Sequence, residues 1–194
     1  EFMSRILAFD TWQEQWGNTD RILTEEQNES VAMQTFSGLD LIKRIVEAQT
    51  DIDGMTAAKR CWNYQKGGLQ WYLPCLMELG VLCAYHDEIN KAMKEIGCPD
   101  ECLLPTEDSD ETWVWSSCEG SQLNSWYVSF SLGSFYSSIK YSSGVVRAVA
   151  AFQPSPSLLT GEAKSNDCLH SDEALINMLR ERGYKGELTK TLTI

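Results

Sequence analysis

The sequence is poor in histidine, the residue on which most nucleophilic and acid–base sites depend. Its 194 residues include only His86 and His170. His86 lies at the junction of two expected helices and His170 just before another, positions typical of surface or capping residues. A catalytic site needs a nucleophile and a base within reach of each other. We therefore expect a protein that is not an enzyme.

Long hydrophobic runs are also missing, and positive charge is scarce. No apolar run reaches the roughly 18 to 20 residues that cross a membrane as a helix, so we expect no membrane insertion. Lys and Arg number 16 against 28 Asp and Glu, which gives a formal net charge of -12 and a pI near 4.6. Such a chain repels phosphate backbones, and nucleic acid is excluded as an expected partner.

The cysteines lack the regular spacing of a disulfide framework or a metal site. They are odd in number and comprise Cys61, Cys75, Cys83, Cys98, Cys102, Cys118 and Cys168. The first three fall within helical apolar patterns, where a thiol behaves as a small buried hydrophobe. No second Cys/His pair follows Cys98 and Cys102 in zinc-site spacing. We predict no metal and no cofactor.

An acidic stretch follows Cys98, and two interpretations of it stay open. Its side chains could gather around calcium, or they could form a solvated loop, which we favour. The Glu-Pro-Asn and Trp-Asn-Asp motifs of calcium-dependent sugar-binding lectins are absent from the sequence. The residues concerned are Asp100, Glu101, Glu107, Asp108, Asp110 and Glu111.

Hydrophobic periodicity predicts helices first and strands afterwards, which is typical of an α+β domain. Up to residue 68 we expect a strand at 6–9, a helix from Ser37 and a second helix from near Asp53. A short strand or turn follows at 69–74, and Pro74 opens a helix over 75–84. A further helix is expected over 87–97. Trp113 and Trp115, and then Trp126, Val128 and Phe130, alternate as strand residues do. An apolar run at 145–152 predicts a further strand.

The residues after Phe152 are expected to form an extension to a domain that covers 1–152. In 153–194 we predict a linker, a helix that begins near Ser171 or Asp172 and ends at Gly183, and a terminal strand at 188–194. This extension could cap the domain, mediate assembly into a homo-oligomer or attach the domain to a larger particle.

The segment 116–143 has an unusual composition. Eleven of its 28 residues are serine, interleaved with tyrosines and glycines. Serine and glycine are weak strand formers, but Tyr with Ser, Gly and Asn is the composition of antibody paratopes. Between Trp115 and Phe152 the only charged residues are Glu119, Lys140 and Arg147. The sequence indicates either an exposed, nearly neutral binding face or a loop-rich sheet with a serine-rich solvent face.

An ordered series of short motifs between Ala57 and Phe152 resembles a known family. The motifs are Trp71-Tyr72-Leu73-Pro74, Glu78-Leu79, Asp87-Glu88-Ile89-Asn90, Trp115-Ser116-Ser117 with Glu119, Trp126-x-Val128-x-Phe130, Gly133 and Val146-Arg147-Ala148-Val149-Ala150-Ala151-Phe152. Their order and spacing are similar to those of the variable proteins of diversity-generating retroelements from gut Bacteroidetes and their phages. That family has the C-type-lectin-like fold of the formylglycine-generating-enzyme subgroup.

The resemblance implies a fold and a set of ligand-binding positions. It implies helices packed on short, twisted antiparallel strands, with a variable region over about 115–152. Positions reachable from randomised asparagine codons are Gly120, Ser121, Leu123, Asn124, Ser129, Leu132, Ser134, Tyr136, Ser138, Ile139, Tyr141, Ser142, Ser143 and Gly144. The implied scaffold is Trp115, Trp126, Val128, Phe130, Val146, Arg147, Val149 and Phe152, with Gln122 and Lys140 as scaffold or peripheral residues.

The resemblance also implies a function. The chain would recognise a surface macromolecule, a protein or a glycan, on a cell or a virion, and would itself belong on a cell surface or a phage particle. The alternatives are a small enzyme of the formylglycine-generating type, with an enclosed pocket around Cys118, and a calcium-dependent sugar-binding module. The enzyme predicts an enclosed pocket around Cys118, the binding protein predicts a broad, exposed and nearly neutral face, and the sugar-binding module predicts dependence on calcium.

Overall fold

A single sheet of six strands organises the α+β fold of the computed structural model, which describes residues 4–17, 22–24, 29–49, 54–106 and 113–152. The strands are β1 (Ser4–Gln15), β2 (Trp71–Tyr72), β3 (Trp113–Glu119), β4 (Asn124–Ser129), β5 (Ser134–Ile139) and β6 (Ser143–Phe152). Their order is β1-β6-β3-β4-β5, and β2 pairs with β6. The extension expected over 153–194 lies outside the described residues.

The helices fall mostly in the first half of the chain, as the periodicity predicts. They are α1 (Glu29–Ala32), α2 (Gly38–Ala48), α3 (Ala57–Trp62), α4 (Leu76–Ala84) and α5 (His86–Glu95), with 3₁₀ turns η1 (Lys66–Gly68) and η2 (Asp100–Cys102). Thr56 caps α3 by accepting a hydrogen bond from the Lys59 backbone N–H. Since a threonine hydroxyl satisfies one of the free N–H groups of a helix start, the helix begins there rather than near Asp53.

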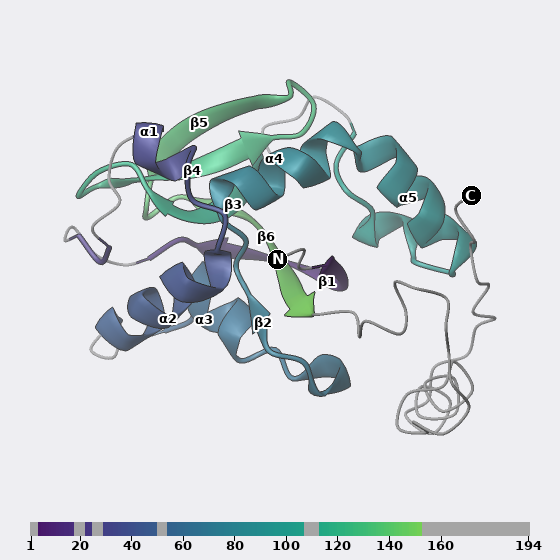
Figure 1. Ribbon diagram of the computed structural model, residues 1–194, viewed down its shortest axis with the longest axis horizontal. Coiled ribbons are helices and arrows are strands. Elements are labelled where there is room, and N and C mark those ends of the chain that lie inside the picture. The colour runs from purple at the N-terminus through teal and green to yellow at the C-terminus, as the bar shows by residue number, and fades with distance from the viewer. Residues whose placement is uncertain (1–3, 18–21, 25–28, 50–53, 107–112, 153–194) are drawn as a thin grey trace, which may run out of the picture.

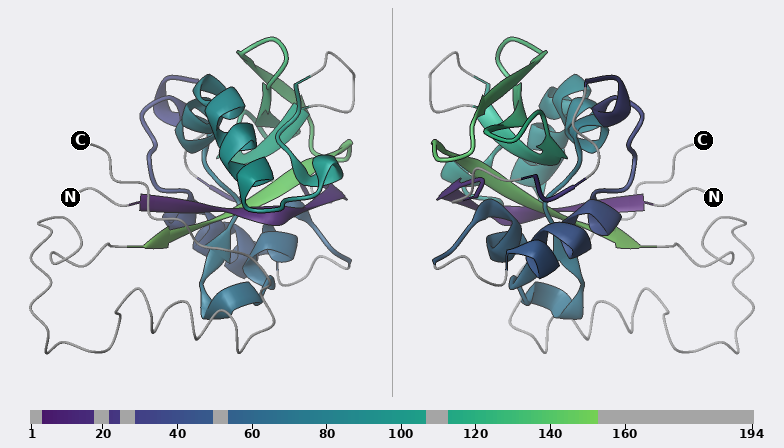
Figure 2. Two further views of the ribbon diagram at one scale, coloured as in Figure 1. Left: turned by 90° about the vertical axis from the view of Figure 1, so that its right-hand side faces the viewer. Right: turned by 90° about the vertical axis from the view of Figure 1, so that its left-hand side faces the viewer.

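The long pair β1 and β6 runs through the middle of the molecule (Figure 1). In the perpendicular views α2 and α3 lie on one side of this pair, while α4, α5 and the strands β3 to β5 lie on the other (Figure 2). The core is continuous between these parts and includes Trp16, Ile45, Leu79, Trp115 and Val149, each at most 1% exposed.

Glu78, in the first turn of α4, joins several elements. Its carboxylate accepts hydrogen bonds from Arg5 Nε at 2.6 Å and from the Tyr72 hydroxyl at 2.9 Å. It also accepts the backbone N–H groups of Gly38 at 3.2 Å and Cys75 at 2.9 Å. A negative charge at a helix start is favourable for the helix dipole. One side chain therefore ties β1 and β2 to the starts of α2 and α4.

Three details differ from the expectations. The pairing of β3 with β6 is parallel, whereas the other pairs are antiparallel. Pro74 precedes the N-cap residue Cys75 instead of opening α4, because Glu78 holds the Cys75 N–H. Val81 and Ile96, expected inside, are 55% and 50% exposed. Periodicity identifies an apolar face, but it does not say how much of that face a neighbour covers.

Candidate functional site

The surface formed by β3 to β6 carries no formal charge over the described residues 113–151. All three charged side chains of this segment are buried, with Glu119 and Lys140 at 0% and Arg147 at 2% exposed. The chain as a whole carries -12. Its acidity therefore lies on other surfaces, and this part of the sheet presents neutral side chains to solvent.

Glu119 and Lys140 form a buried ion pair beneath that surface. Lys140 Nζ lies 2.5 Å from Glu119 Oε1, and it also lies 5.0 Å from the ring centroid of Trp16. The carboxylate accepts further hydrogen bonds from the backbone N–H groups of Leu23 and Thr24 and from the Thr24 hydroxyl. Lys140, expected as a scaffold or peripheral residue, is thus a core residue that fixes the end of β5 to β3.

Arg147 is the third buried charge and holds the long strand pair. Its guanidinium donates to the carbonyls of Ala8 at 3.1 Å and Phe9 at 2.7 Å, and also to the carbonyl of Cys102. These bonds lie where the β1–β6 register shifts, between Leu7 and Thr11. Burial lowers the pKa of Arg147 from its usual value. Arg147 is therefore an internal residue that ties β6 to β1 and to η2.

Four aromatic rings form a row across β3, β4 and β5, which we call the aromatic row. Trp115 and Trp113 contact edge to face at 4.6 Å, Trp113 and Tyr127 lie 4.6 Å apart, and Tyr127 and Tyr136 lie 5.7 Å apart. Trp115 is fully buried and Tyr136 is 41% exposed. The row therefore runs from the core to the surface, and packing holds its outermost ring in place.

The candidate positions differ in exposure. The exposed ones are Leu123, Leu132, Tyr136, Ile139, Tyr141 and Ser143. The half-buried ones are Gly120, Ser121, Asn124, Ser134, Ser138 and Ser142. Ser129 and Gly144 are buried, so neither offers side-chain surface to a ligand. An added Cβ at Gly144 would lie 2.3 Å from the Trp113 ring.

The register of β4 and β5 divides the candidates between two faces. Tyr136 pairs with Tyr127, and its neighbours two residues away, Ser134 and Ser138, share the aromatic-row face. Ile139 lies on the opposite face with Phe135, which contacts α4 at Gly80. Of the other candidates, Gly120, Ser121 and Leu123 lie at or beyond the end of β3, Leu132 lies in the β4–β5 turn, and Tyr141 and Ser142 follow β5.

Several serines have structural roles that composition did not reveal. The Ser121 hydroxyl accepts the backbone N–H groups of Leu123 and Asn124 and so shapes the β3–β4 turn. The Ser116 hydroxyl donates to the Trp126 carbonyl at 2.8 Å. The sequence predicted that the serines form either a solvent face or a binding face. Each prediction holds for only some of them, because others form hydrogen bonds with the backbone.

The implied scaffold residues are largely internal. Trp115, Val128, Phe130, Val146, Arg147 and Val149 are buried, and Trp126 is half-buried. The side chain of Phe152 lies outside the described residues. Burial does not follow the spacing by two in β3 and β6, because neighbouring residues such as Val114 and Trp115, or Val146 and Arg147, are both buried. Alternation alone therefore does not separate inward from outward residues in these two strands.

Cys118, the nucleophile of the enzyme alternative, is fully buried. Its sulfur accepts the backbone N–H of Leu76 at 3.4 Å. Cys75 is buried beside it, and burial together with the charge of Glu78 raises the pKa of the Cys75 thiol well above its usual value. A raised thiol pKa reduces the thiolate fraction that reacts. These thiols have the surroundings of core residues.

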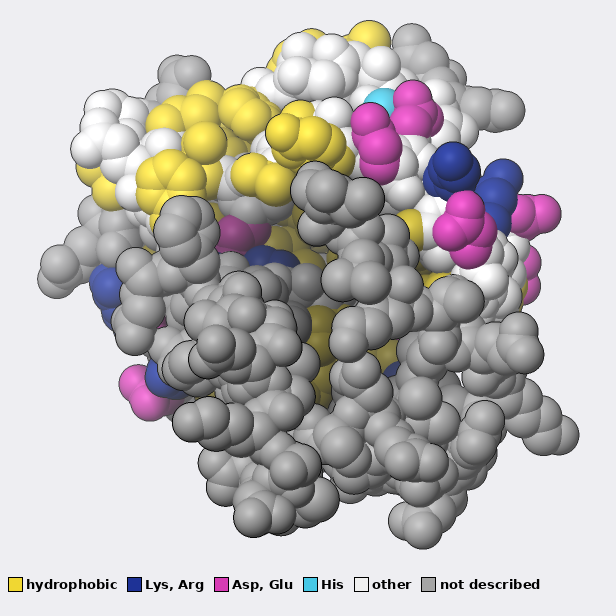
Figure 3. Space-filling model, turned by 45° about the vertical axis from the view of Figure 1, so that its right-hand side comes forward, with side chains coloured by type: hydrophobic (Ala, Val, Ile, Leu, Met, Phe, Trp, Pro, Cys, Tyr) yellow, Lys and Arg dark blue, Asp and Glu magenta, His cyan; other side chains and the backbone are white. Residues whose placement is uncertain are grey.

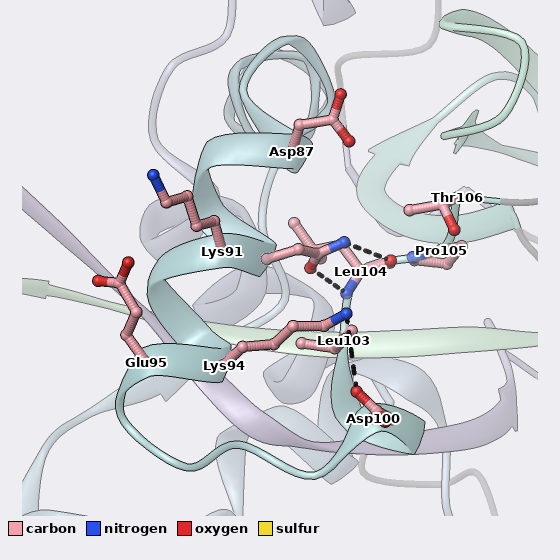
Figure 4. Close-up of a pocket in the computed structure, with 10 residues that line it drawn as sticks. Asp87, Lys91, Lys94, Glu95, Asp100, Leu103, Leu104, Pro105 and Thr106 are labelled. Atoms are coloured by element: carbon pink, nitrogen blue, oxygen red, sulfur yellow. Dashed lines mark hydrogen bonds and ion pairs between the residues drawn. The ribbon is translucent and has the colours of Figure 1, made fainter.

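A groove that sequence reasoning did not anticipate lies between α5 and the segment 100–106 (Figure 4). Its volume is about 640 Å³. Asn90, one of the lining residues, exchanges two hydrogen bonds with the Leu104 backbone, at 2.7 and 2.9 Å, and Lys94 faces Asp100 at 3.8 Å. The groove contains none of the candidate positions, and its lining mixes both signs of charge.

Neither a group of metal ligands nor a membrane-spanning helix is found within the described ranges. Within them, no three His, Cys, Asp or Glu side chains are grouped so as to hold a metal ion. No helix there is long and apolar enough to cross a membrane. The acidic residues Glu107, Asp108, Asp110 and Glu111 lie outside those ranges. Comparison with protein-family models and with curated proteins finds no match to this chain.

Proposed function

We propose that this chain is a ligand-binding protein of the retroelement-diversified class with a C-type-lectin-like fold, and that it recognises a protein or glycan on a cell or virion surface. The binding face consists of Tyr136, Tyr141, Leu132, Ser134 and Ser138. The observation that carries the proposal is an uncharged, tyrosine- and serine-bearing surface held by a fully buried ion pair.

The rigidity of the support favours binding. The backbone N–H of Lys140 donates to the Leu123 carbonyl at 2.9 Å, and the Lys140 carbonyl accepts the Gly17 N–H at 3.2 Å. The Glu119–Lys140 pair lies directly beneath these bonds. A face that is ordered before it meets a ligand loses less conformational entropy on binding. The tilted ring contact of Tyr127 with Tyr136 has the same consequence for Tyr136.

The two alternatives receive less support. An enzyme of the formylglycine-generating type requires an accessible thiol, and Cys118 is 0% exposed. A calcium-dependent sugar-binding module requires an oxygen-ligand cluster, which the described residues do not form. A glycan stays within the proposal as a ligand, recognised by tyrosine rings and hydroxyl groups without a metal.

A display-based binding screen tests the proposal. The protein is presented to bacterial-cell and phage-receptor fractions beside a variant with Leu132, Tyr136 and Tyr141 all changed to alanine. The matched control carries three exposed apolar residues from other surfaces, also changed to alanine: Ile22, Met55 and Ile96. We expect the first variant to lose binding and the control to retain it, with all three proteins melting at the same temperature.

Other outcomes would contradict the proposal. Equal binding by the two variants would place the ligand site elsewhere. Unfolding of the first variant would mean that its three side chains belong to the core, against their exposure of 41% to 54%. Loss of binding on calcium chelation would favour the sugar-binding module instead.

A further inference from the structure

The two edges of the sheet differ in how they are protected from pairing with another strand. An exposed edge strand presents free N–H and C=O groups, and natural proteins block such edges with charged side chains, proline or bulges. Strand β1 forms one edge and β5 the other. The two strands differ in the charged side chains and in the irregularities of register that protect an edge.

The β1 edge carries several protective features. Arg5, Asp10 and Glu14 place charges along it, and they pair with Glu78, Lys66 and Arg60 respectively. The register with β6 also shifts between Leu7 and Thr11, which marks a bulge or irregularity. Charged side chains and a bulge are the features that make an edge strand a poor partner for another strand.

The β5 edge has none of these features within its described span, Ser134–Ile139. Its sequence SFYSSI holds no charged residue and no proline. Its register with β4 is continuous over six residue pairs, so no bulge interrupts it. Tyr136, Ser137 and Ile139 are exposed, and among the described residues no strand pairs with the outer side of β5.

Helix α4 presents an apolar strip next to this open edge. Phe135 of β5 lies against Gly80, where an added Cβ would come within 3.1 Å of its ring. Successive residues of a helix are rotated by about 100°, so Ala84, Met77 and Val81 follow Gly80 in turn around the helix on the side away from buried Leu79 and Cys83. Val81 is 55% exposed and Ala84 is also exposed.

The space-filling view agrees with this arrangement. Hydrophobic side chains gather on the face over α4, beside the charged start of α5 (Figure 3). A strand added beyond β5 would lie over the Ala84, Met77 and Val81 strip, just as β5 lies over Gly80. The exposed strip and the unprotected edge are therefore two parts of one uncompleted surface.

We propose that β5 pairs antiparallel with β5 of a second copy of this chain, forming a two-fold symmetric dimer with a continuous sheet. The strand is complementary to itself about Ser137. In that register Phe135 faces Ile139 of the other copy, and Tyr136 faces Ser138, which places apolar side chains opposite each other on the α4 face and polar ones on the aromatic-row face. Both sets are favourable cross-strand combinations.

Charge also favours a second copy at this position. Two chains of net charge -12 repel each other through most of their surfaces. The surface of 113–151 is uncharged over its described residues, so copies can approach there without bringing like charges together. The α4 strips of the two copies would then be brought next to the shared edge, where they could cover each other.

A dimer would also strengthen ligand binding, and this consequence of the dimer is the one that rests on the proposed function. Tyr136 of each copy would lie diagonally across from the other, at about 7 to 8 Å in an antiparallel pair. The two aromatic rows would join into one face with twice the contact area. A ligand with repeated epitopes would then be held by two linked faces, which raises avidity without any new contact.

Sedimentation of the full-length chain over a concentration series tests the dimer. Ser137→Lys places two like charges at the symmetry axis, and Val81→Lys places a charge in the apolar strip. We expect each to raise the dimer dissociation constant at least roughly tenfold. Ile96→Lys, at a residue of similar exposure that follows the end of α5, is the control and should leave the dissociation constant unchanged. Equal melting temperatures ensure that folding is not the cause.

Cross-linking by a single engineered cysteine tests the register. In antiparallel pairs, opposite Cα atoms lie about 4.5 or 5.5 Å apart, within disulfide reach. With oxidised glutathione, Ser137→Cys should form a covalent dimer, because its two thiols meet at the axis. Ser143→Cys, also exposed but on β6, should not.

Three results would overturn the dimer: a monomer at about 100 µM, far above the Kd of a stable assembly; a dimer insensitive to Ser137→Lys; or equal cross-linking of the two cysteines. A chain cut after residue 152 that dimerises while the full-length chain stays monomeric would also overturn it. None of these experiments uses the ligand. A failure here therefore leaves the binding screen to decide the proposed function.

Discussion

The two halves of the sheet use charge in opposite ways. Around β1 several charges are at least partly exposed and form ion pairs between elements, as Arg60 does with Glu14 and Lys66 with Asp10, while Arg147 is buried there. Around β4 and β5 the charged pair, Glu119 and Lys140, is completely buried and the surface is neutral. Both halves belong to one sheet and share the same core.

This difference shows how a chain of net charge -12 can keep one neutral surface. Placing the ion pair inside lets it fix the β3 and β5 ends without adding charge outside. A buried pair is costly unless its hydrogen bonds are completed, and here the backbone of Leu23 and Thr24 completes those of Glu119. The surface above it is then open to variation in its exposed side chains.

The largest expected effect comes from breaking the buried pair. Lys140→Met leaves the Glu119 carboxylate buried and without its cation, which should lower the free energy of unfolding by about 3 to 5 kcal/mol. Lys66→Met is the matched change in the other half, where the pair is 42% to 45% exposed and should cost at most about 1 kcal/mol. Urea unfolding followed by tryptophan fluorescence measures both, and equal losses would contradict the contrast.

A smaller effect is expected from filling the space beside the aromatic row. Gly144→Ala places a methyl group 2.3 to 2.9 Å from the Trp113 ring, and the resulting overpacking should cost about 1 to 3 kcal/mol. Gly120→Ala is the control, because its nearest neighbour, Trp126 Nε1, would lie at 3.3 Å. Thermal unfolding compares the two. If Gly144→Ala leaves the melting temperature unchanged, position 144 tolerates a side chain and the predicted overpacking is wrong.

The smallest effects are expected at the exposed candidate positions. Leu123→Ser and Tyr141→Ser change side chains that are 50% and 41% exposed, so the free energy of unfolding should stay within about 0.5 kcal/mol of the original. Val128→Ser, on the buried side of β4, should cost about 2 kcal/mol or more. Urea midpoints separate these cases, and a large loss at Leu123 or Tyr141 would mean that the neutral surface is part of the core.

Much of the fold could be predicted because apolar periodicity survives in the sequence. The alternation of Trp113 with Trp115 and the run 145–152 correspond to β3 and β6, and the helical spacing around Ile42 and Ile45 corresponds to α2. Helix starts were less predictable. Thr56 and Cys75 open α3 and α4 through hydrogen bonds with a backbone N–H or a carboxylate three residues further on, which hydrophobic periodicity does not record.

The candidate site was only partly predictable. Tyr136, Tyr141 and Leu132 are exposed as the composition suggested, but Ser129 and Gly144 are buried. Codon reachability identifies which residues can vary and says nothing about neighbours in space. Lys140 was not expected in the core, because a lone lysine in a serine-rich stretch gives no sign of the partner, Glu119, that lies 21 positions earlier.

The sequence by itself determined the α+β class, the acidic balance and the scarcity of charge between Trp115 and Phe152, because each depends on composition or on spacing along the chain. Only the tertiary structure decided that the three charges in that segment are buried, that β5 is an edge to which no further strand of the described residues pairs, and that Val81 of α4 is exposed beside it. Burial and strand order arise from contacts between distant segments, and such contacts become visible only once the chain is folded.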